Sequence, residues 1–152
     1  MKLTTFASIA AIAWATTGVE ANQNLGADHE QVYCLAQNIY FESRNESNLG
    51  QQSVAWVTLN RVDDSRFPDQ ICDVVWQDRQ FSWTHDGRSD TPREAEAWQI
   101  AQFNAMYVLH NREDKMDPTE GSTHYHATYV SPNWARDLDR IVRIDEHIFY
   151  RW

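Results

Sequence analysis

The stretch that begins at His29 and ends at Glu42 constrains the fold more than any other part of the chain. Four of its apolar residues recur at three- and four-residue spacing, as on one face of an α-helix: Val32, Leu35, Ala36 and Ile39. This spacing predicts a helix over residues 29–41 with one buried face. Glu42 continues that face where polar residues replace apolar ones. Desolvation there would raise the pKa of its carboxyl group toward values at which it donates a proton near neutral pH.

Glu46 is the nearest candidate for a second carboxylate beside Glu42. If the helix continues, Glu46 follows at i+4 on the same side, and the like charge raises one of the two pKa values further. The alternative for Glu42 is an ordinary acid at a helix end, paired with Arg44 or Arg61. The residues around Glu42 leave both interpretations open.

The first 21 residues are typical of a secretory signal peptide. Lys2 precedes a short apolar run, and Val19-Glu20-Ala21 has the small-x-small pattern of a signal-peptidase site. We therefore predict a signal peptide over 1–21 and one folded domain over 22–152, exported to the periplasm, the cell wall or the extracellular medium. A retained membrane anchor is the alternative. Once the signal is removed, we expect no contact with a membrane.

Export determines how the cysteines are interpreted. Cys34 and Cys72 are the chain's two cysteines, and they do not form a Cys-x-x-Cys motif. In an oxidising compartment this pair predicts a disulfide, which would tie the helix before Glu42 to the segment around Ile71. Two free, buried thiols are the alternative.

Composition narrows the range of partners. A formal net charge of −9 at pH 7 argues against binding of nucleic acid or anionic lipid, because these partners are negatively charged as well. Seven Trp and six Tyr residues fit a groove that stacks on carbohydrate, although most of them are packing residues. We expect a monomer that uses no cofactor.

Helical patterns precede strand patterns along the chain, which indicates an α+β fold. A polar lead over 22–28 comes before the first helix, and the later patterns predict helices over 49–62, 71–77 and 91–109 and an extended stretch over 80–83. Ser47 caps the second helix, while Thr91 and Glu94 form a capping box at the last one. A small antiparallel sheet follows, with a strand over 123–130 and a hairpin of 140–144 and 147–152 around Asp145-Glu146.

The segment Asn38-Ile39-Tyr40-Phe41-Glu42-Ser43-Arg44 resembles the signature of SleB-type cell wall hydrolases, Ile-Tyr-x-Glu-Ala-Arg-x-Glu. Ser43 stands where Ala is usual, and Asn45 stands where Gly is usual. The similarity continues in register through further motifs: Gly50-Gln51, Val54-Ala55-Trp56-Val57, Leu59-Asn60-Arg61-Val62, Phe67-Pro68, Ile71-Cys72-Asp73-Val74-Val75, Gln80-Phe81-Ser82-Trp83, Thr123-His124-Tyr125-His126, Ser131-Pro132-Asn133-Trp134 and His147-Ile148-Phe149. Together these motifs cover essentially all of 22–152.

The resemblance implies that 22–152 is a compact single lysozyme-like or resuscitation-factor-like catalytic domain that cleaves the glycan strands of peptidoglycan. The signature acid maps onto Glu42. We expect a lytic transglycosylase, in which one Glu cleaves the β-1,4 bond between N-acetylmuramic acid and N-acetylglucosamine. Hydrolysis would normally require a second carboxylate, for which Glu46, Asp73 and Asp86 are the candidates.

Five residues are candidates for substrate binding in the groove. Four could donate hydrogen bonds to acetamido groups: Gln80, Ser82, His124 and Tyr125. Trp83 could provide a stacking platform for a sugar ring.

Two other classes of function compete with this one. His124 and His126 alternate on a predicted strand, so a metal-dependent N-acetylmuramoyl-L-alanine amidase could use both, with His147 or a Glu as third ligand. The chain has no His-Glu-x-x-His motif, and we predict no metal site. A non-catalytic wall-binding protein is the other alternative, against which the presence of Glu42 argues.

Overall fold

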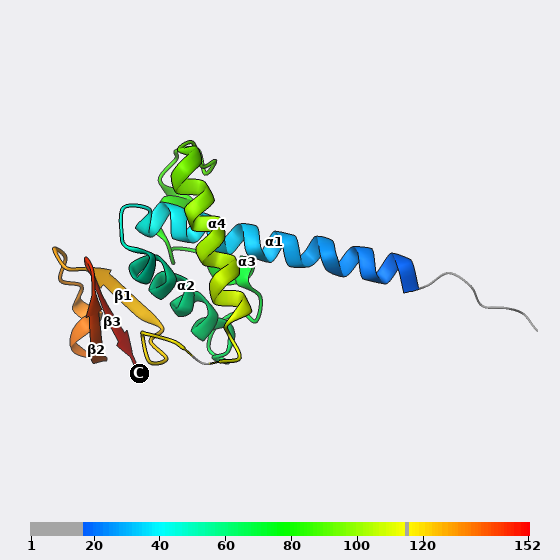
Figure 1. The fold of residues 1–152 in the computed structure, drawn as a ribbon. Helices are drawn as coiled ribbons and strands as arrows, with labels where there is room; N and C mark the ends of the chain where they lie inside the picture. The colour runs from blue at the N-terminus through cyan, green and yellow to red at the C-terminus, as the bar shows by residue number, and fades with distance from the viewer. Residues whose placement is uncertain (1–16, 115) are drawn as a thin grey trace, which may run out of the picture.

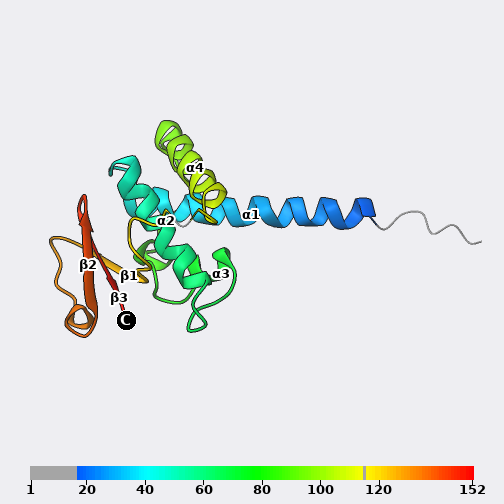
Figure 2. The same ribbon diagram turned by 60° about the horizontal axis from the view of Figure 1, so that its bottom comes forward.

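Helix α1 (Thr17–Ser43) is the element around which the other helices pack. The computed structural model describes residues 17–114 and 116–152. Within them α1 contacts α2 (Asn48–Val62), α3 (Ile71–Val75) and α4 (Ala95–His110). Figures 1 and 2 show the first turns of α1 extending away from the rest of the molecule, at the end opposite the β-sheet. The C-terminal turns of α1 therefore lie inside the fold.

The predicted apolar face of α1 is confirmed. Leu35, Ala36 and Ile39 have no exposed surface, because they face the other helices. The helix starts earlier than predicted, so the expected polar lead over 22–28 is wrong. Those residues lack proline and include good helix formers, which lets the helix extend through them.

Most of the predicted signal peptide lies outside the described residues. Residues 1–16 belong to the undescribed part, and 17–21 form the first turns of α1. The signal peptide and its cleavage site stay predictions. Within residues 17–114 and 116–152, no helix combines the length and apolar character needed to cross a membrane.

Helix α2 is buried on nearly all sides, which a one-sided apolar pattern does not predict. Ser53 satisfies its hydroxyl on the helix backbone, where its Oγ donates to the carbonyl of Leu49 at 2.7 Å, whereas Gln52 and Arg61 reach Asn104 and the carbonyl of Thr123. The predicted N-cap is confirmed, because Ser47 Oγ accepts a hydrogen bond from the backbone N–H of Gly50. A central helix of this kind can carry residues to several neighbours at once.

Three antiparallel strands pack beside the helices, as predicted for an α+β fold. They are β1 (His124–Ala127), β2 (Asp139–Ile144) and β3 (His147–Arg151), in the order β1-β3-β2. The hairpin around Asp145-Glu146 is confirmed, and the predicted strand over 123–130 is shorter than expected. Phe149 and Ile144 bury the inner face of the sheet against Val57 of α2.

Two predictions on the segment between α3 and α4 are wrong. Residues 82–85 form a 3₁₀ turn, η1 (Ser82–His85), instead of an extended stretch. Helix α4 begins at Ala95, so Thr91 and Glu94 form no capping box. The hydroxyl of Tyr40 accepts the backbone N–H groups of Arg93 and Glu94 at 3.2 and 3.1 Å, and this long-range contact holds the segment in a non-helical conformation.

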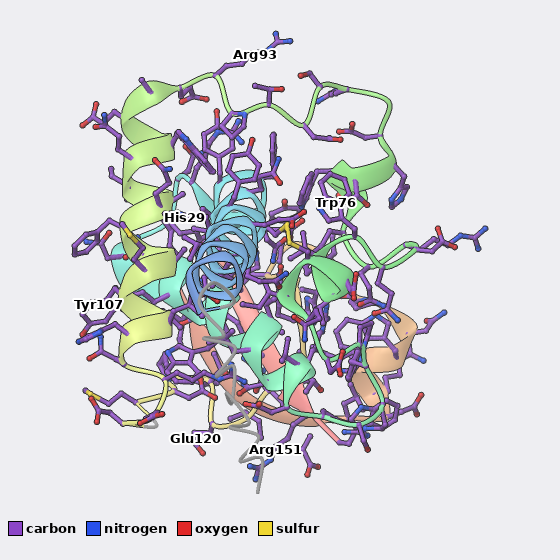
Figure 3. The ribbon with its side chains drawn as sticks, turned by 90° about the vertical axis from the view of Figure 1, so that its right-hand side faces the viewer. His29, Trp76, Arg93, Tyr107, Glu120 and Arg151 are labelled. Atoms are coloured by element: carbon purple, nitrogen blue, oxygen red, sulfur yellow. A yellow bond between two sulfur atoms is a disulfide. The ribbon has the colours of Figure 1, made fainter. Side chains whose placement is uncertain are left out.

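The predicted disulfide between Cys34 and Cys72 is confirmed. It joins α1 to α3 across a sequence separation of 38 residues (Figure 3). The bridge therefore fixes the short helix α3, which is only 5 residues long, against α1.

Replacing both cysteines by serine is expected to lower the free energy of unfolding by about 3–4 kcal/mol, because the 38-residue loop is no longer closed in the unfolded chain. Urea denaturation followed by circular dichroism measures this change. A reducing agent should destabilise the wild type to the same extent and leave the double variant unchanged. Equal urea midpoints for the oxidised wild type and the double variant would contradict the expectation.

Candidate active site

Glu42 lies one residue before the end of α1 and is only partly exposed. The helix ends at Ser43, whose Oγ donates to the carbonyl of Ile39 at 2.9 Å, and the chain then turns toward the cap of α2. The hydroxyl of Tyr125, from β1, donates to Glu42 Oε2 at 3.0 Å. The site is thus built where the C-terminal end of α1 meets the sheet.

Arg61 of α2 places a buried positive charge near this carboxyl group. Its Nε donates to the carbonyl of Thr123 at 2.7 Å, which holds the guanidinium beside the start of β1. The rings of Phe67 and Phe81 each lie 5.4 Å from its central carbon. No acidic side chain forms an ion pair with Arg61 within the described ranges, so its charge is not neutralised locally.

These surroundings act on the proton of Glu42 in opposite directions. Burial raises the pKa of Glu42, and the hydrogen bond from Tyr125 and the charge of Arg61 lower it by a smaller amount. The pKa of Tyr125 is itself raised well above its ordinary value by burial and by Glu42, so Tyr125 stays a neutral donor. The result is a carboxyl group that holds its proton above the usual pH range yet has partners for its ionised form.

Glu46, the predicted second carboxylate, is bound elsewhere. Its Oε2 accepts the backbone N–H of Glu146 at 3.2 Å, and its Oε1 lies 3.6 Å from His147 Nδ1. The carboxylate of Asp145 in the same turn accepts both the backbone N–H and the hydroxyl of Ser47. Glu46 therefore joins the hairpin to the segment between α1 and α2.

Gly50 makes this close approach of the hairpin to α2 possible. A Cβ atom at this position would lie 2.4 Å from Asp145 Oδ2 and 3.0 Å from the side chain of Glu46. Such contacts are too short, so a larger residue would push the turn of the hairpin away from the helices.

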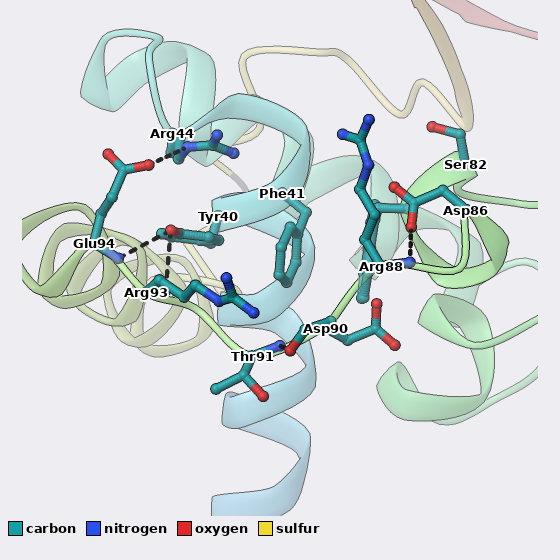
Figure 4. A pocket seen from close by; sticks show the side chains of 12 residues that line it. Tyr40, Phe41, Arg44, Ser82, Asp86, Arg88, Asp90, Thr91, Arg93 and Glu94 are labelled. Carbon is teal, nitrogen blue, oxygen red and sulfur yellow. Dashed lines mark hydrogen bonds and ion pairs between the residues drawn. The ribbon is translucent and has the colours of Figure 1, made fainter.

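A pocket of about 630 Å³ lies between the end of α1 and the loop before α4, and Tyr40, Phe41 and Arg44 line it from α1 (Figure 4). Glu42 is not among its lining residues. Two of the predicted substrate-binding residues, Ser82 and Trp83, line it. Asp86, named as an alternative second carboxylate, lines it as well, whereas Asp73 lies exposed on α3.

Trp83 is less accessible than a sugar-stacking platform requires. Only 6% of its surface is exposed, its ring stacks on Phe41 at 4.7 Å, and its indole N–H donates to Asn38 Oδ1. Phe41 covers Trp83 and itself lines the pocket. Gln80 lies in the turn before η1 and is not among the lining residues. Substrate contacts by Gln80, Ser82 and Trp83 stay predictions.

The histidines of the sheet do not converge with Glu42. Because side chains alternate along β1, His124 and His126 lie on the face opposite Tyr125. His124 packs against Trp134 and Trp152, and burial lowers its pKa to about 4.

His147 packs against Tyr125, with 5.1 Å between the ring centroids, so it lies on the helix-facing side of the sheet. The three histidines named for a metal-dependent amidase therefore do not meet. Residues 17–114 and 116–152 hold no group of three His, Cys, Asp or Glu arranged for a metal.

Sequence reasoning missed the role of Arg61 and the arginines of the loop before α4. Arg61 entered only as an ion-pair partner for a surface Glu42, although its i+4 spacing from Val57 on a buried helix could have indicated its position. Arg88 and Arg93 carried no recognisable signal, because tertiary contacts alone bring their loop to the pocket.

Residues 45–150 match a family described as Cell Wall Hydrolase, a region that begins three residues after Glu42. The chain is 31% identical over 130 residues to a spore cortex-lytic enzyme of Halalkalibacterium halodurans, covering 84% of this chain and 37% of that protein. It is 32% identical over 138 residues to the spore cortex-lytic enzyme of Bacillus subtilis, covering 86% of this chain and 41% of that protein. The chain therefore spans less than half the length of these curated relatives.

Solved structures match over most of their length. The catalytic domain of the germination-specific lytic transglycosylase SleB from Bacillus anthracis has a TM-score of 0.66 and 30% identity, covering 80% of this chain and 93% of that one. The catalytic domain of Bacillus cereus SleB has a TM-score of 0.67 and 30% identity, covering 81% and 91%. The lysozyme-like single-domain expectation thus agrees with the fold of these catalytic domains.

Glu42→Gln is expected to stabilise the protein at neutral and alkaline pH. The ordinary pKa of 4.5 applies in the unfolded chain, and burial raises the pKa in the folded protein. The folded state therefore binds the proton more tightly, and stability falls as pH rises from 4.5 through the folded pKa. Gln, a neutral isostere, removes that loss.

Thermal melting across pH tests this expectation. The variant should melt above the wild type at about pH 8, and the difference should narrow below about pH 4, where both states are protonated. Glu113→Gln, an exposed acid after α4, serves as the matched control and should show no such pattern. A wild type that melts above Glu42→Gln at alkaline pH would contradict the assignment.

Proposed function

Since the chain belongs to the cell wall hydrolase family, we propose that it cleaves peptidoglycan glycan strands as a lytic transglycosylase with Glu42 as its catalytic acid. The proposal rests on one observation: a partly buried carboxyl group with a raised pKa, which accepts a hydrogen bond from Tyr125 where the end of α1 meets the sheet. The names of the related spore cortex-lytic enzymes and of the SleB lytic transglycosylase support the same chemistry.

In the first half of the reaction, Glu42 acts as a general acid. It donates its proton to the β-1,4 bridging oxygen between N-acetylmuramic acid and N-acetylglucosamine. The bond from the anomeric carbon to that oxygen breaks, and its electron pair leaves with the oxygen. Glu42 is then a carboxylate, which the hydroxyl of Tyr125 and the charge of Arg61 stabilise.

In the second half, the same carboxylate acts as a base. The C6 hydroxyl of the muramic acid forms a bond to its own anomeric carbon, and Glu42 takes the proton that this hydroxyl loses. The product carries a 1,6-anhydro ring, and no water is consumed. Glu42 returns to its protonated form, ready for another strand.

One carboxylate suffices for this sequence, and the surroundings of Glu46 agree with it. Hydrolysis by an inverting or retaining route requires a second carboxylate that is free to face the sugar or a water. Glu46 is instead occupied by the hairpin turn at Glu146 and His147. Of the other two candidates, Asp73 lies exposed on α3, and Asp86 accepts the backbone N–H of Arg88 at 2.8 Å within its own loop. We therefore favour transglycosylation over hydrolysis.

The substrate class also indicates where the protein acts. Peptidoglycan lies outside the cytoplasmic membrane, so we propose an exported protein of the periplasm or cell wall, consistent with the predicted signal peptide over 1–21. A disulfide between Cys34 and Cys72 agrees with an oxidising compartment.

Digestion of purified sacculi, with mass spectrometry of the soluble products, tests the proposal. Anhydro-muropeptides, one water lighter than hydrolysis products, are expected with and without EDTA. Glu42→Gln should reduce their formation by roughly 10²–10⁴-fold, the usual contribution of a general acid. Reducing-end muropeptides would make the enzyme a hydrolase, and free stem peptides that vanish with EDTA would make it an amidase.

Tyr125→Phe is expected to shift the alkaline limb of the kcat/KM profile to higher pH. The hydroxyl of Tyr125 lowers the pKa of Glu42, so its removal lets Glu42 keep the catalytic proton further into the alkaline range. Tyr150→Phe is the matched control, because its hydroxyl lies 3.0 Å from His126 on the other face of the sheet. A limb that moves to lower pH, or that moves equally in both variants, would contradict this role.

A further inference from the structure

The outer face of helix α4 carries large, exposed apolar side chains. Its inner face packs on α1 and α2 and contains four buried residues: Ala101, Asn104, Ala105 and Val108. Its outer face carries an apolar stripe of four residues that are 38–58% exposed: Ile100, Phe103, Met106 and Tyr107. Figure 3 shows Tyr107 directed away from the other helices. The outer face of a surface helix is usually polar, so this stripe is a candidate contact surface.

No other described element has a comparable surface. Within residues 17–114 and 116–152, every other helix or strand carries at most one exposed large apolar residue. Single residues of this kind are normal on a protein surface, whereas a contiguous patch marks a place of interaction.

The residues of the stripe and its two ends are arranged symmetrically about Phe103, which lies near the middle of the 16-residue helix. Ile100 precedes Phe103 by three residues, and Met106 follows it by three. Glu96 precedes Phe103 by seven residues and His110 follows it by seven, so each lies about two turns away on the same face. Both end residues are exposed. The stripe therefore has apolar side chains on both sides of its centre, an acid at one end and an imidazole at the other.

We propose that the stripe is the interface of a two-fold dimer, in which α4 of one copy packs antiparallel on α4 of a second copy of this chain. In a two-fold interface the same patch serves both partners. Antiparallel packing centred on Phe103 places Ile100 against the partner's Met106 and Glu96 against the partner's His110. A parallel arrangement would instead place Glu96 against the partner's Glu96, and like charges in contact oppose association.

A second copy suits the stripe better than an anionic membrane surface does. Glu96 lies at one end of the stripe and the formal net charge is −9, so an anionic surface would be repelled. The rings of Phe103 and Tyr107 are already stacked, with 6.2 Å between their centroids, so association orders them at little further cost. The interface is small and the two copies carry equal net charges, so we expect a Kd in the micromolar range. This dimer differs from the monomer expected from the sequence.

Sedimentation equilibrium over a range of protein concentrations, at an ionic strength of about 0.15 M, tests the proposal. The wild type should show a monomer–dimer equilibrium. Phe103→Glu places two like charges against each other at the two-fold axis, so its Kd should rise about tenfold or more, and Phe103→Lys should behave in the same way. An equimolar mixture of the two variants should associate again, because an acid then meets a base across the axis.

Tyr129→Glu is the matched control, because Tyr129 is 84% exposed and lies outside the stripe, and its Kd should equal that of the wild type. Circular dichroism verifies that all variants are folded. A wild type that stays monomeric at every concentration, a Phe103→Glu variant that still associates as the wild type does, or a mixture that does not associate would each overturn the proposed interface. Self-association is measured without substrate, so its result is independent of the chemistry proposed for Glu42.

Discussion

The rest of the structure depends on the contact between the end of α1 and the first strand of the sheet. Tyr125 and Glu42 are 83 residues apart in the sequence, and the elements between them are placed so that these two side chains meet. Arg61 donates a hydrogen bond to the carbonyl of Thr123, just before β1, and its charge lowers the pKa of Glu42 without a direct ion pair. Burial of an ionisable group costs free energy unless partners compensate it, and here the partners come from two other elements, Tyr125 from β1 and Arg61 from α2. The pKa of Glu42 therefore depends on the tertiary fold and not on the helix alone.

The contact that holds the β2–β3 hairpin against the helices is itself made of charged groups. Glu46 and Asp145 bring the hairpin turn onto the segment before α2, and Gly50 leaves the room for them. This contact gives Glu46, the second acid of the signature, a structural role that does not require it to be catalytic. If the hairpin moved, β3 and then β1 would move with it, and Tyr125 would no longer meet Glu42.

The sequence predicted what depends on local pattern and failed where distant residues decide. The buried face at Leu35 and Ile39, the Ser47 cap and the hairpin follow from spacing and turn chemistry, and the disulfide follows from the compartment. The start of α4 was wrong because the hydroxyl of Tyr40 competes for the backbone groups that a capping box would use. Strand alternation could have separated His124 from Tyr125 in advance, whereas the position of Arg88 and Arg93 had no local signal at all.

A single carboxyl group that acts first as an acid and then as a base needs one influence that favours its protonated form and another that stabilises its carboxylate. Burial alone would keep Glu42 protonated but would make the carboxylate that follows proton donation too costly. Tyr125 and Arg61 alone would leave it ionised before the reaction starts. The combination raises the pKa of Glu42 and still provides partners for its carboxylate, which suits proton transfer in both directions.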